Sequence, residues 1–225
     1  MTMEFKLNRI DPLKKQPEIE KGLDEGLSPM DPPEAYAPPS MELVSPAEMH
    51  PFLRGCVDEH APFLMEVNAF EDTIISIQKE GYTKEADSKL KHFFNFFDEE
   101  FIPHNRREEA TIFPLLRERL LASGEHGVGD DPVTAIDMME DEHTKAAQLA
   151  AVILNFLGLA FRLPDEKTKL IILDAALEQS KFLIELLRLH VFREDNVVFP
   201  LAHRLITRAE FDEMQPKAAT ARILS

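Results

Sequence analysis

From residue 46 onward, apolar residues recur every three or four positions, which is the spacing of one face of an α-helix. Glycines, prolines and polar runs interrupt this pattern near positions 81, 124 and 163. The pattern predicts long helices, and nowhere does it alternate as a β-strand would. The expected helices cover residues 46–79, 83–122, 133–161 and 165–205, with a short further helix near 208–214.

Short connections between long helices favour antiparallel neighbours. The predicted fold class is therefore all-α, an antiparallel up-down-up-down four-helix bundle over residues 46–215, followed by a tail at 216–225. Ser45, Pro46 and Glu48 have the order of an N-cap, a first helical residue and a capping-box acid, which predicts the start of the first helix.

The first 46 residues differ from the rest of the chain because they hold eight of its 16 prolines. So many prolines exclude a long helix, since proline lacks the amide hydrogen that a helix needs. We interpret residues 1–45 as an extended, proline-rich N-terminal arm. Such an arm can wrap its own bundle or cross to a second copy in a homodimer, and the sequence leaves both arrangements open.

Composition narrows the class of protein. Apolar residues make up 44% of the chain, enough for a sizeable core, and the net charge of −16 argues against a nucleic-acid or anionic-membrane partner. The first ten residues lack the apolar segment of a secretion signal, and no apolar run approaches the roughly 18 residues of a membrane span. Cys56 is the single cysteine, so an intrachain disulfide is excluded. We expect a cytoplasmic protein.

One polar sequence motif occurs twice. The segments HNRREEATIFPLL (residues 104–116) and HVFREDNVVFPLA (residues 190–202) both place Glu four residues after His and Phe-Pro five residues after Glu. Aligned over 17 positions from their histidines, they share His, Arg, Glu, Phe, Pro and Leu. The triplet Asp-Glu-His also recurs, ending at His60 and at His143. The first two long helices therefore resemble the last two.

The repeated residues lie on apolar stripes of their helices, so they are expected to face the core. They are His60, His104, Glu108, His143, His190 and Glu194. A buried carboxylate costs several kcal/mol unless it is paired or bound to a metal, and no Lys or Arg lies on these stripes. A dinuclear metal centre would satisfy all six, with two histidines for each ion and both glutamates as bridges. The mixed donors suit iron best, with manganese or zinc as alternatives.

A single His-x-x-x-Glu is usually a solvated pair on a helix surface. Here the same pair recurs on two apolar faces, and that recurrence favours a metal site. The other four histidines, His50, His92, His126 and His203, are expected to be surface or capping residues. Cys56 is expected to be a small buried core residue, with a supporting or redox role beside His60 as the alternative.

These motifs resemble those of the hemerythrin-like, or HHE cation-binding, family over about residues 47–206. The resemblance implies a bundle that holds a non-haem centre of two iron ions with an oxo or hydroxo bridge. Its ligands would be the same six residues, His60, His104, Glu108, His143, His190 and Glu194. Oxygen-carrying hemerythrins have a further histidine four residues after the one matched by His143, where this chain has Ala147.

That departure argues against reversible oxygen carriage and predicts an open metal position near Ala147. Glu194 repeats the geometry of Glu108, so Glu194 is preferred as the ligand and Asp195 is left exposed or in a supporting role. Glu140, one turn before His143, is a further acid that we expect near the ligands.

Three functions remain open. The centre binds or senses dioxygen, nitric oxide, peroxide or the iron and redox state; or it catalyses peroxide reduction or oxygenase-type chemistry near Ala147; or it holds a structural zinc ion. The sequence does not decide whether the protein is an enzyme. It does predict helix distortions near the ligands, because four prolines lie close to the histidines: Pro62, Pro103, Pro114 and Pro200.

Overall fold

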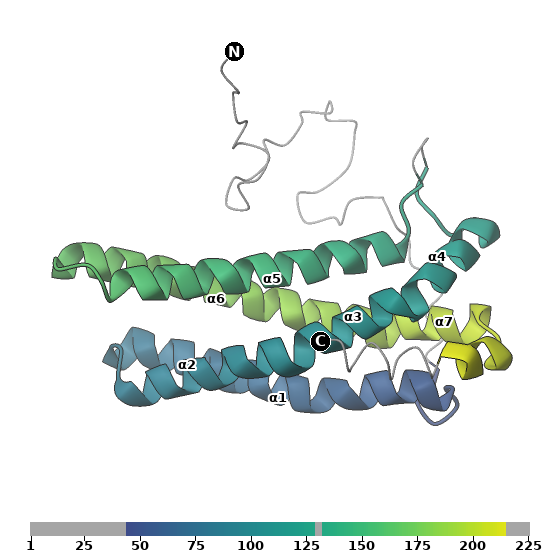
Figure 1. Cartoon of the computed structure of the whole chain (residues 1–225), viewed down its shortest axis with the longest axis horizontal. Coiled ribbons are helices and arrows are strands. Elements are labelled where there is room, and N and C mark those ends of the chain that lie inside the picture. The colour runs from purple at the N-terminus through teal and green to yellow at the C-terminus, as the bar shows by residue number, and fades with distance from the viewer. Residues whose placement is uncertain (1–43, 129–131, 215–225) are drawn as a thin grey trace, which may run out of the picture. The chain divides into compact units, whose positions relative to one another are not determined.

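The computed structural model describes residues 44–128 and 132–214, and within these ranges every regular element is a helix (Figure 1). The elements are α1 (Pro51–Glu80), α2 (Lys84–Phe96), the π-helical turn η2 (Phe97–Phe101), α3 (Ile102–Ala110), α4 (Ile112–Ser123), α5 (Ala135–Ala160), α6 (Glu166–Arg193), the π-helical turn η3 (Glu194–Val198) and α7 (Phe199–Leu205). Residues 208–214 are also helical, as expected. The all-α class is confirmed.

Two helical hairpins form the body of the fold. A turn at Gly81 joins α1 to α2, and residues 161–165 join α5 to α6. Helix α1 packs on both α2 and α6, and α5 packs on α6 (Figure 1). The two hairpins thus form a helical bundle. All but the last two residues of the predicted N-terminal arm, and the whole tail at 216–225, lie outside the described residues.

Local capping explains where several helices begin and where two of them end. Thr83 accepts the amide hydrogen of Ala86, Asp165 accepts that of Thr168, and Thr134 forms a capping box with Asp137. At the other ends, Gly81 and Gly124 adopt φ angles of 86° and 80°, which favour glycine.

The first helix starts later than the sequence predicted. Residues 46–48 form a turn, and α1 begins at Pro51. The side chain of His50 accepts the amide hydrogen of Phe52 at 3.2 Å, and its ring stacks on Phe211 with centroids 5.0 Å apart. Helix α1 therefore starts at Pro51 and not at Pro46. The N-cap His50 accounts for this start, because its ring both accepts a backbone hydrogen bond and packs on Phe211.

Two of the expected long helices are interrupted near the candidate ligands. The one expected at 83–122 is divided at η2 and again at Thr111, and the one expected at 165–205 is divided at η3. Pro103, Pro114 and Pro200 each lie in the first turn after an interruption. Proline crowds the carbonyl four residues earlier, and a broken or widened turn relieves this clash. Pro62, by contrast, lies inside α1 without ending it.

Phenylalanine dominates the core between the candidate ligands and the turn at Gly81. Phe70 and Phe93 stack with centroids 3.9 Å apart, and Phe63 stacks on Phe101 at 4.6 Å. This packing fixes the spacing of α1 against α2 and η2. Among the described residues, no helix is long and apolar enough to cross a membrane.

Candidate metal centre

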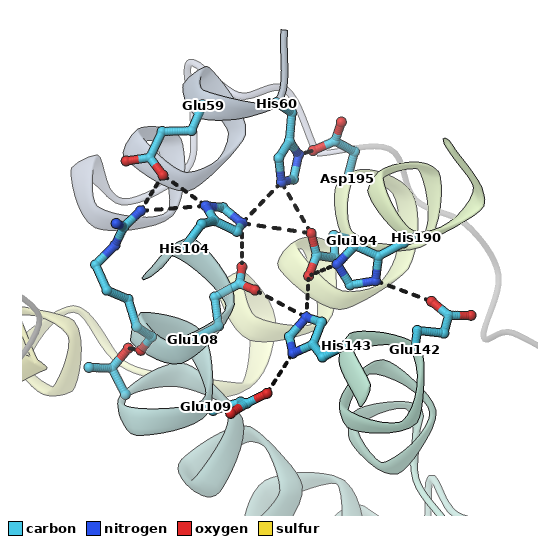
Figure 2. A network of polar contacts seen from close by, with 12 residues as sticks. Glu59, His60, His104, Glu108, Glu109, Glu142, His143, His190, Glu194 and Asp195 are labelled. Atoms are coloured by element: carbon cyan, nitrogen blue, oxygen red, sulfur yellow. Dashed lines mark hydrogen bonds and ion pairs between the residues drawn. The ribbon is translucent and has the colours of Figure 1, made fainter. Parts of the chain in front are cut away.

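The structure brings together all six residues that the sequence singled out (Figure 2). They come from four places on the bundle, namely α1, α3, α5, and the end of α6 with η3. All six are at least 95% buried: His60, His104, Glu108, His143, His190 and Glu194. Segments up to 134 residues apart in the chain (His60 to Glu194) therefore meet at one polar cluster inside an apolar bundle.

Glu194 lies between two pairs of histidines. Its Oε2 is 3.1 Å from His60 Nε2 and 3.9 Å from His104 Nε2. Its Oε1 is 3.1 Å from His190 Nε2 and 3.9 Å from His143 Nε2. Each oxygen of one carboxylate thus faces a different pair of imidazoles, as a bridging ligand would.

Ligand atoms of His60, His104 and Glu194 lie within 4.8 Å of one another, and so do those of His143, His190 and Glu194. We call these groups the first and the second half-site. Glu108 belongs to neither compact group but lies between them. One of its oxygens is 3.3 Å from His104 Nε2, and the other is 3.8 Å from His143 Nε2.

Several of these buried atoms have close neighbours but no aligned hydrogen bond. They are both carboxylate oxygens of Glu108, both of Glu194, and the Nε2 atoms of His143 and His190. Leaving a buried polar atom unsatisfied costs about 1–3 kcal/mol, and more for charged groups. Cations held between the carboxylates and the imidazoles would satisfy these atoms together. The donor set therefore fits a transition-metal centre.

Each histidine uses its other ring nitrogen to contact an acid outside the cluster. The distances from Nδ1 are 2.8 Å for His60 to Asp195, 2.8 Å for His104 to Glu59, 2.7 Å for His143 to Glu109 and 3.2 Å for His190 to Glu142. We call these four acids the outer carboxylates. An Nδ1–H that donates to a carboxylate leaves the Nε2 lone pair facing inward, which is how metal-binding histidines are commonly oriented.

The outer carboxylates form two kinds of link. Glu59 and Glu142 directly precede His60 and His143, support a histidine of the other helix in their own hairpin, and pair with Arg107 and Arg193 respectively. Asp195 and Glu109 instead connect the two hairpins, because each supports a histidine of the opposite one.

Sequence reasoning missed most of this outer layer. It left Asp195 either exposed or in a supporting role, and the contact with His60 favours the second alternative. It expected Glu140 near the ligands too, but Glu140 instead lies near Arg117 at 3.7 Å. The repeat contained the missing signal. Both copies read His-x-x-Arg-Glu followed by a second acid, and both Asp-Glu-His triplets carry the acid before the histidine.

Burial and mutual contact shift the pKa values of these groups when no metal shares them. Burial lowers the pKa of His60, but Asp195 and Glu194 outweigh that effect and raise it to about 9. Burial and the charge on Glu194 raise the pKa of Glu108. Burial also acts to raise the pKa of Glu194, but His190 and its neighbours lower it well below the usual value. The raised pKa values of His60 and Glu108 mean that protons compete with a metal for these two side chains.

A cavity of about 300 Å³ lies against the first half-site, and His60, His104 and Glu194 line it. The sequence placed the open position near Ala147 instead. That expectation is wrong for this cavity, because Ala147 is solvent-exposed on α5 and is not among the lining residues. The side chain four residues after His143 points out of the bundle, so its small size opens no space inside.

Cys56, His50 and His92 are core, capping and surface residues, as the sequence predicted. Cys56 is buried, and burial raises the pKa of its thiol to about 12, so it stays a neutral core residue. His50 caps α1, and His92 is exposed and lies 3.3 Å from Glu66. These residues are not members of either half-site.

An all-helical fold around buried histidines and shared carboxylates defines a metal-binding helical bundle. Consistent with this, the model of the hemerythrin HHE cation binding domain matches residues 53–202. The chain therefore belongs to the hemerythrin HHE family. The match contains both half-sites and all four outer carboxylates.

The chain is also similar to curated proteins named iron-sulfur cluster repair protein YtfE. Those of Escherichia coli O1:K1, Escherichia coli SMS-3-5 and Escherichia fergusonii are each 27% identical over 113 residues, which is 50% of this chain and 46% of the relative. The chain thus spans about half the length of the curated relatives that it matches. No solved structure gives a significant match.

Proposed function

We propose that this chain is a non-haem di-iron protein that binds or senses a small ligand, such as dioxygen, nitric oxide or peroxide, or the iron and redox state. The observation that carries this proposal is the position of Glu194. Its two oxygens face two separate histidine pairs, at 3.1 Å from the nearest nitrogen of each. One carboxylate shared in this way fits two ions better than one.

The chain's own residues have distinct parts in this proposal. Each half-site supplies two imidazoles, and Glu194 and Glu108 connect the half-sites. The outer carboxylates hold the ring orientation of all four histidines. Iron suits this mixture of nitrogen and oxygen donors, and when bound it would supply a redox-active position for a small ligand. Manganese or zinc would be weaker candidates.

The proposed architecture is an antiparallel up-down-up-down arrangement of two hairpins around the metal pair. Support comes from the contacts of α1 with α6 and of α5 with α6, which run beside the half-sites. In this arrangement each hairpin contributes two histidines and one glutamate. Bundles commonly build dinuclear carboxylate sites from inward residues on facing helices.

The second candidate function is a di-iron enzyme for peroxide reduction or oxygenase-type chemistry. The cavity favours it, because about 300 Å³ is far more than a diatomic molecule needs. A water molecule, of similar size to a diatomic, occupies roughly 30 Å³. This candidate places the reactive position at the first half-site rather than near Ala147.

Metal analysis of protein purified without added metal tests the proposal, combined with optical spectra before and after reduction. We expect two iron ions per chain and near-ultraviolet absorption that bleaches on reduction. One zinc ion per chain, with no such bands, would contradict both candidates. Rates of reoxidation by air, peroxide and nitric oxide would then distinguish reversible binding from turnover.

A further inference from the structure

The cavity over the first half-site has a chemical character that a gas-binding pocket does not need. Its inner wall is formed by the half-site, and its sides are Pro62, Phe63, Phe96, Phe101 and Val191. Its remaining lining residues are three carboxylates with solvent-exposed side chains, Glu59, Glu99 and Glu100. The cavity therefore passes from an acidic mouth, along aromatic walls, to the candidate metal ligands.

Residues of the π-helical turn η2 form part of this mouth. A π-turn adds a residue to one turn of a helix, and such turns often occur at functional sites. Glu99, Glu100 and Phe101 of η2 all line the cavity. In the repeat, the corresponding residues 183–187 lie in the regular helix α6, and no cavity residue comes from that stretch.

The acids at the mouth differ in how they are neutralised. Glu59 is paired with Arg107 and with His104. Within the described part of the chain, Glu99 and Glu100 form no ion pair, and no Lys or Arg lines the cavity. The deepest lining residue, Glu194, is fully buried, and neither of its oxygens has an aligned hydrogen bond. Because His60 and His104 stand beside Glu194 at the inner end, the uncompensated negative charge is concentrated at the mouth, at Glu99 and Glu100.

We propose that this cavity binds an organic cation with an apolar body, seated on the phenylalanines with its charge near Glu99 and Glu100. Aromatic faces attract organic ammonium groups, and carboxylates at the mouth attract the same charge while repelling anions. A fully hydrated metal ion would fit the apolar walls poorly. Because the cavity reaches His60 and His104, this inference rests on the proposed metal function and assigns the class of molecule brought to the first half-site.

Three probes of similar size and different charge test the inference on the iron-loaded full chain: benzyltrimethylammonium, benzyl alcohol and benzoate. The quaternary cation cannot coordinate a metal, so its binding reports the cavity alone. By calorimetry or NMR titration we expect the cation to bind most tightly and benzoate most weakly. Equal binding of all three, or preference for benzoate, would overturn the inference.

Single charge removals supply the matched variants. Glu99→Gln and Glu100→Gln should each weaken binding of the cation about two- to fivefold, the size of an exposed ion pair, and leave benzyl alcohol unchanged. The control is Asp98→Asn, in the same π-turn but outside the lining. If Asp98→Asn weakens binding of the cation equally, binding depends only on the net charge of this surface and not on the carboxylates that line the cavity. If the glutamate variants only slow uptake of ferrous iron, the cavity is a metal route and the inference fails.

Iron content, measured on each sample, keeps this test separate from the proposed function. Full iron loading without charge selectivity overturns the cation site and leaves the di-iron proposal intact. A chain that takes up no iron contradicts the di-iron proposal. The probe titrations remain readable in that case, because protein side chains alone form the cavity walls.

Discussion

The two half-sites are built from the same parts but face different surroundings. Each has an acid-histidine pair on one helix and a His-x-x-Arg-Glu segment on another. In each, an arginine holds the acid that orients the histidine of that segment. Yet of the four histidines the cavity contacts only His60 and His104 of the first half-site. The π-turn η2 precedes His104, whereas the corresponding residues before His190 lie in the regular helix α6.

This difference separates metal binding from access to the site, two properties that would be the same in both halves of a fully symmetric repeat. Identical ligand layers give both positions the donors that a metal needs. The change in helix type alters access without altering a ligand, because η2 ends before the helix that carries His104. The two half-sites therefore differ in the helix type one to two turns before His104 and His190, and the cavity lies on the side of the π-turn.

The largest effect is expected from the residue that the half-sites share. Glu194→Ala should remove metal from both positions, whereas His60→Ala should spare the second. In the metal-free chain, Glu194→Ala should also lower the free energy of unfolding by about 3–5 kcal/mol, because the buried histidines lose their counter-charge. Metal analysis and urea unfolding measure the two effects. Retention of two ions per chain in Glu194→Ala would refute the shared ligand.

Proton competition should weaken metal binding at both half-sites. The pKa of His104 is raised well above its usual value and that of His60 to about 9, while those of His143 and His190 are also raised. Each proton that a metal displaces makes the apparent affinity rise about tenfold per pH unit below that pKa. We expect metal affinity to fall at both half-sites as the pH is lowered, which calorimetric titration between pH 6 and 9 can show.

The same protons act on the stability of the metal-free chain with the opposite sign. A raised pKa for His60 contributes stability that is fully present below its unfolded value near 6.5 and is lost as pH rises through about 9. Across this window the metal-free chain should lose stability while metal affinity increases. Parallel changes in the two quantities would argue against protons and metal sharing His60.

A smaller effect is expected from the outer carboxylates. Asp195→Asn should weaken metal binding at the first half-site, and Glu109→Gln at the second, each by about 10- to 100-fold. The matched control is Asp141→Asn, since Asp141 pairs with Lys145 and contacts no histidine. Site-resolved paramagnetic NMR would report which half-site weakens. If either variant weakens metal binding equally at both half-sites, these acids do not each support a single histidine.

The smallest effect is expected when only the access of a small ligand to the first half-site is changed. Val191→Phe should fill part of the cavity and slow the reaction of the iron-loaded protein with peroxide or nitric oxide severalfold, while the iron content stays unchanged. Ala147→Phe, on the exposed surface beside the second half-site, should leave that rate unaltered. Stopped-flow measurements compare the two. The reverse result would restore the position near Ala147 and exclude the cavity as the route.

The buried cluster of six residues was predictable from the sequence because each member is a polar residue repeated on an apolar stripe, while their role as metal ligands stays a prediction. Helical periodicity alone places His104 and Glu108 on one face, and the repeat identifies the second pair. The same reasoning predicted the helical fold and distortions near Pro103 and Pro200. It could not predict which distortion becomes a π-turn, because that depends on how α2 packs against α1.

The outer layer and the cavity were harder to predict, for different reasons. Arg107 and Arg193 were visible as identities in the repeat, but their partners Glu59 and Glu142 lie on other helices, so only the folded arrangement joins them. Ala147 misled because a small residue four positions after a ligand suggests space. Whether position 147 faces the interior depends on how α5 is rotated about its own axis in the bundle. An alanine at this position gives no indication of that rotation.

Anomalous diffraction at the iron edge, on crystals of protein purified without added metal, would show directly whether the chain holds two iron ions. We expect two iron peaks, one between His60 and His104 and one between His143 and His190, with Glu194 contacting both. A single peak, or peaks outside this cluster of six residues, would contradict this expectation.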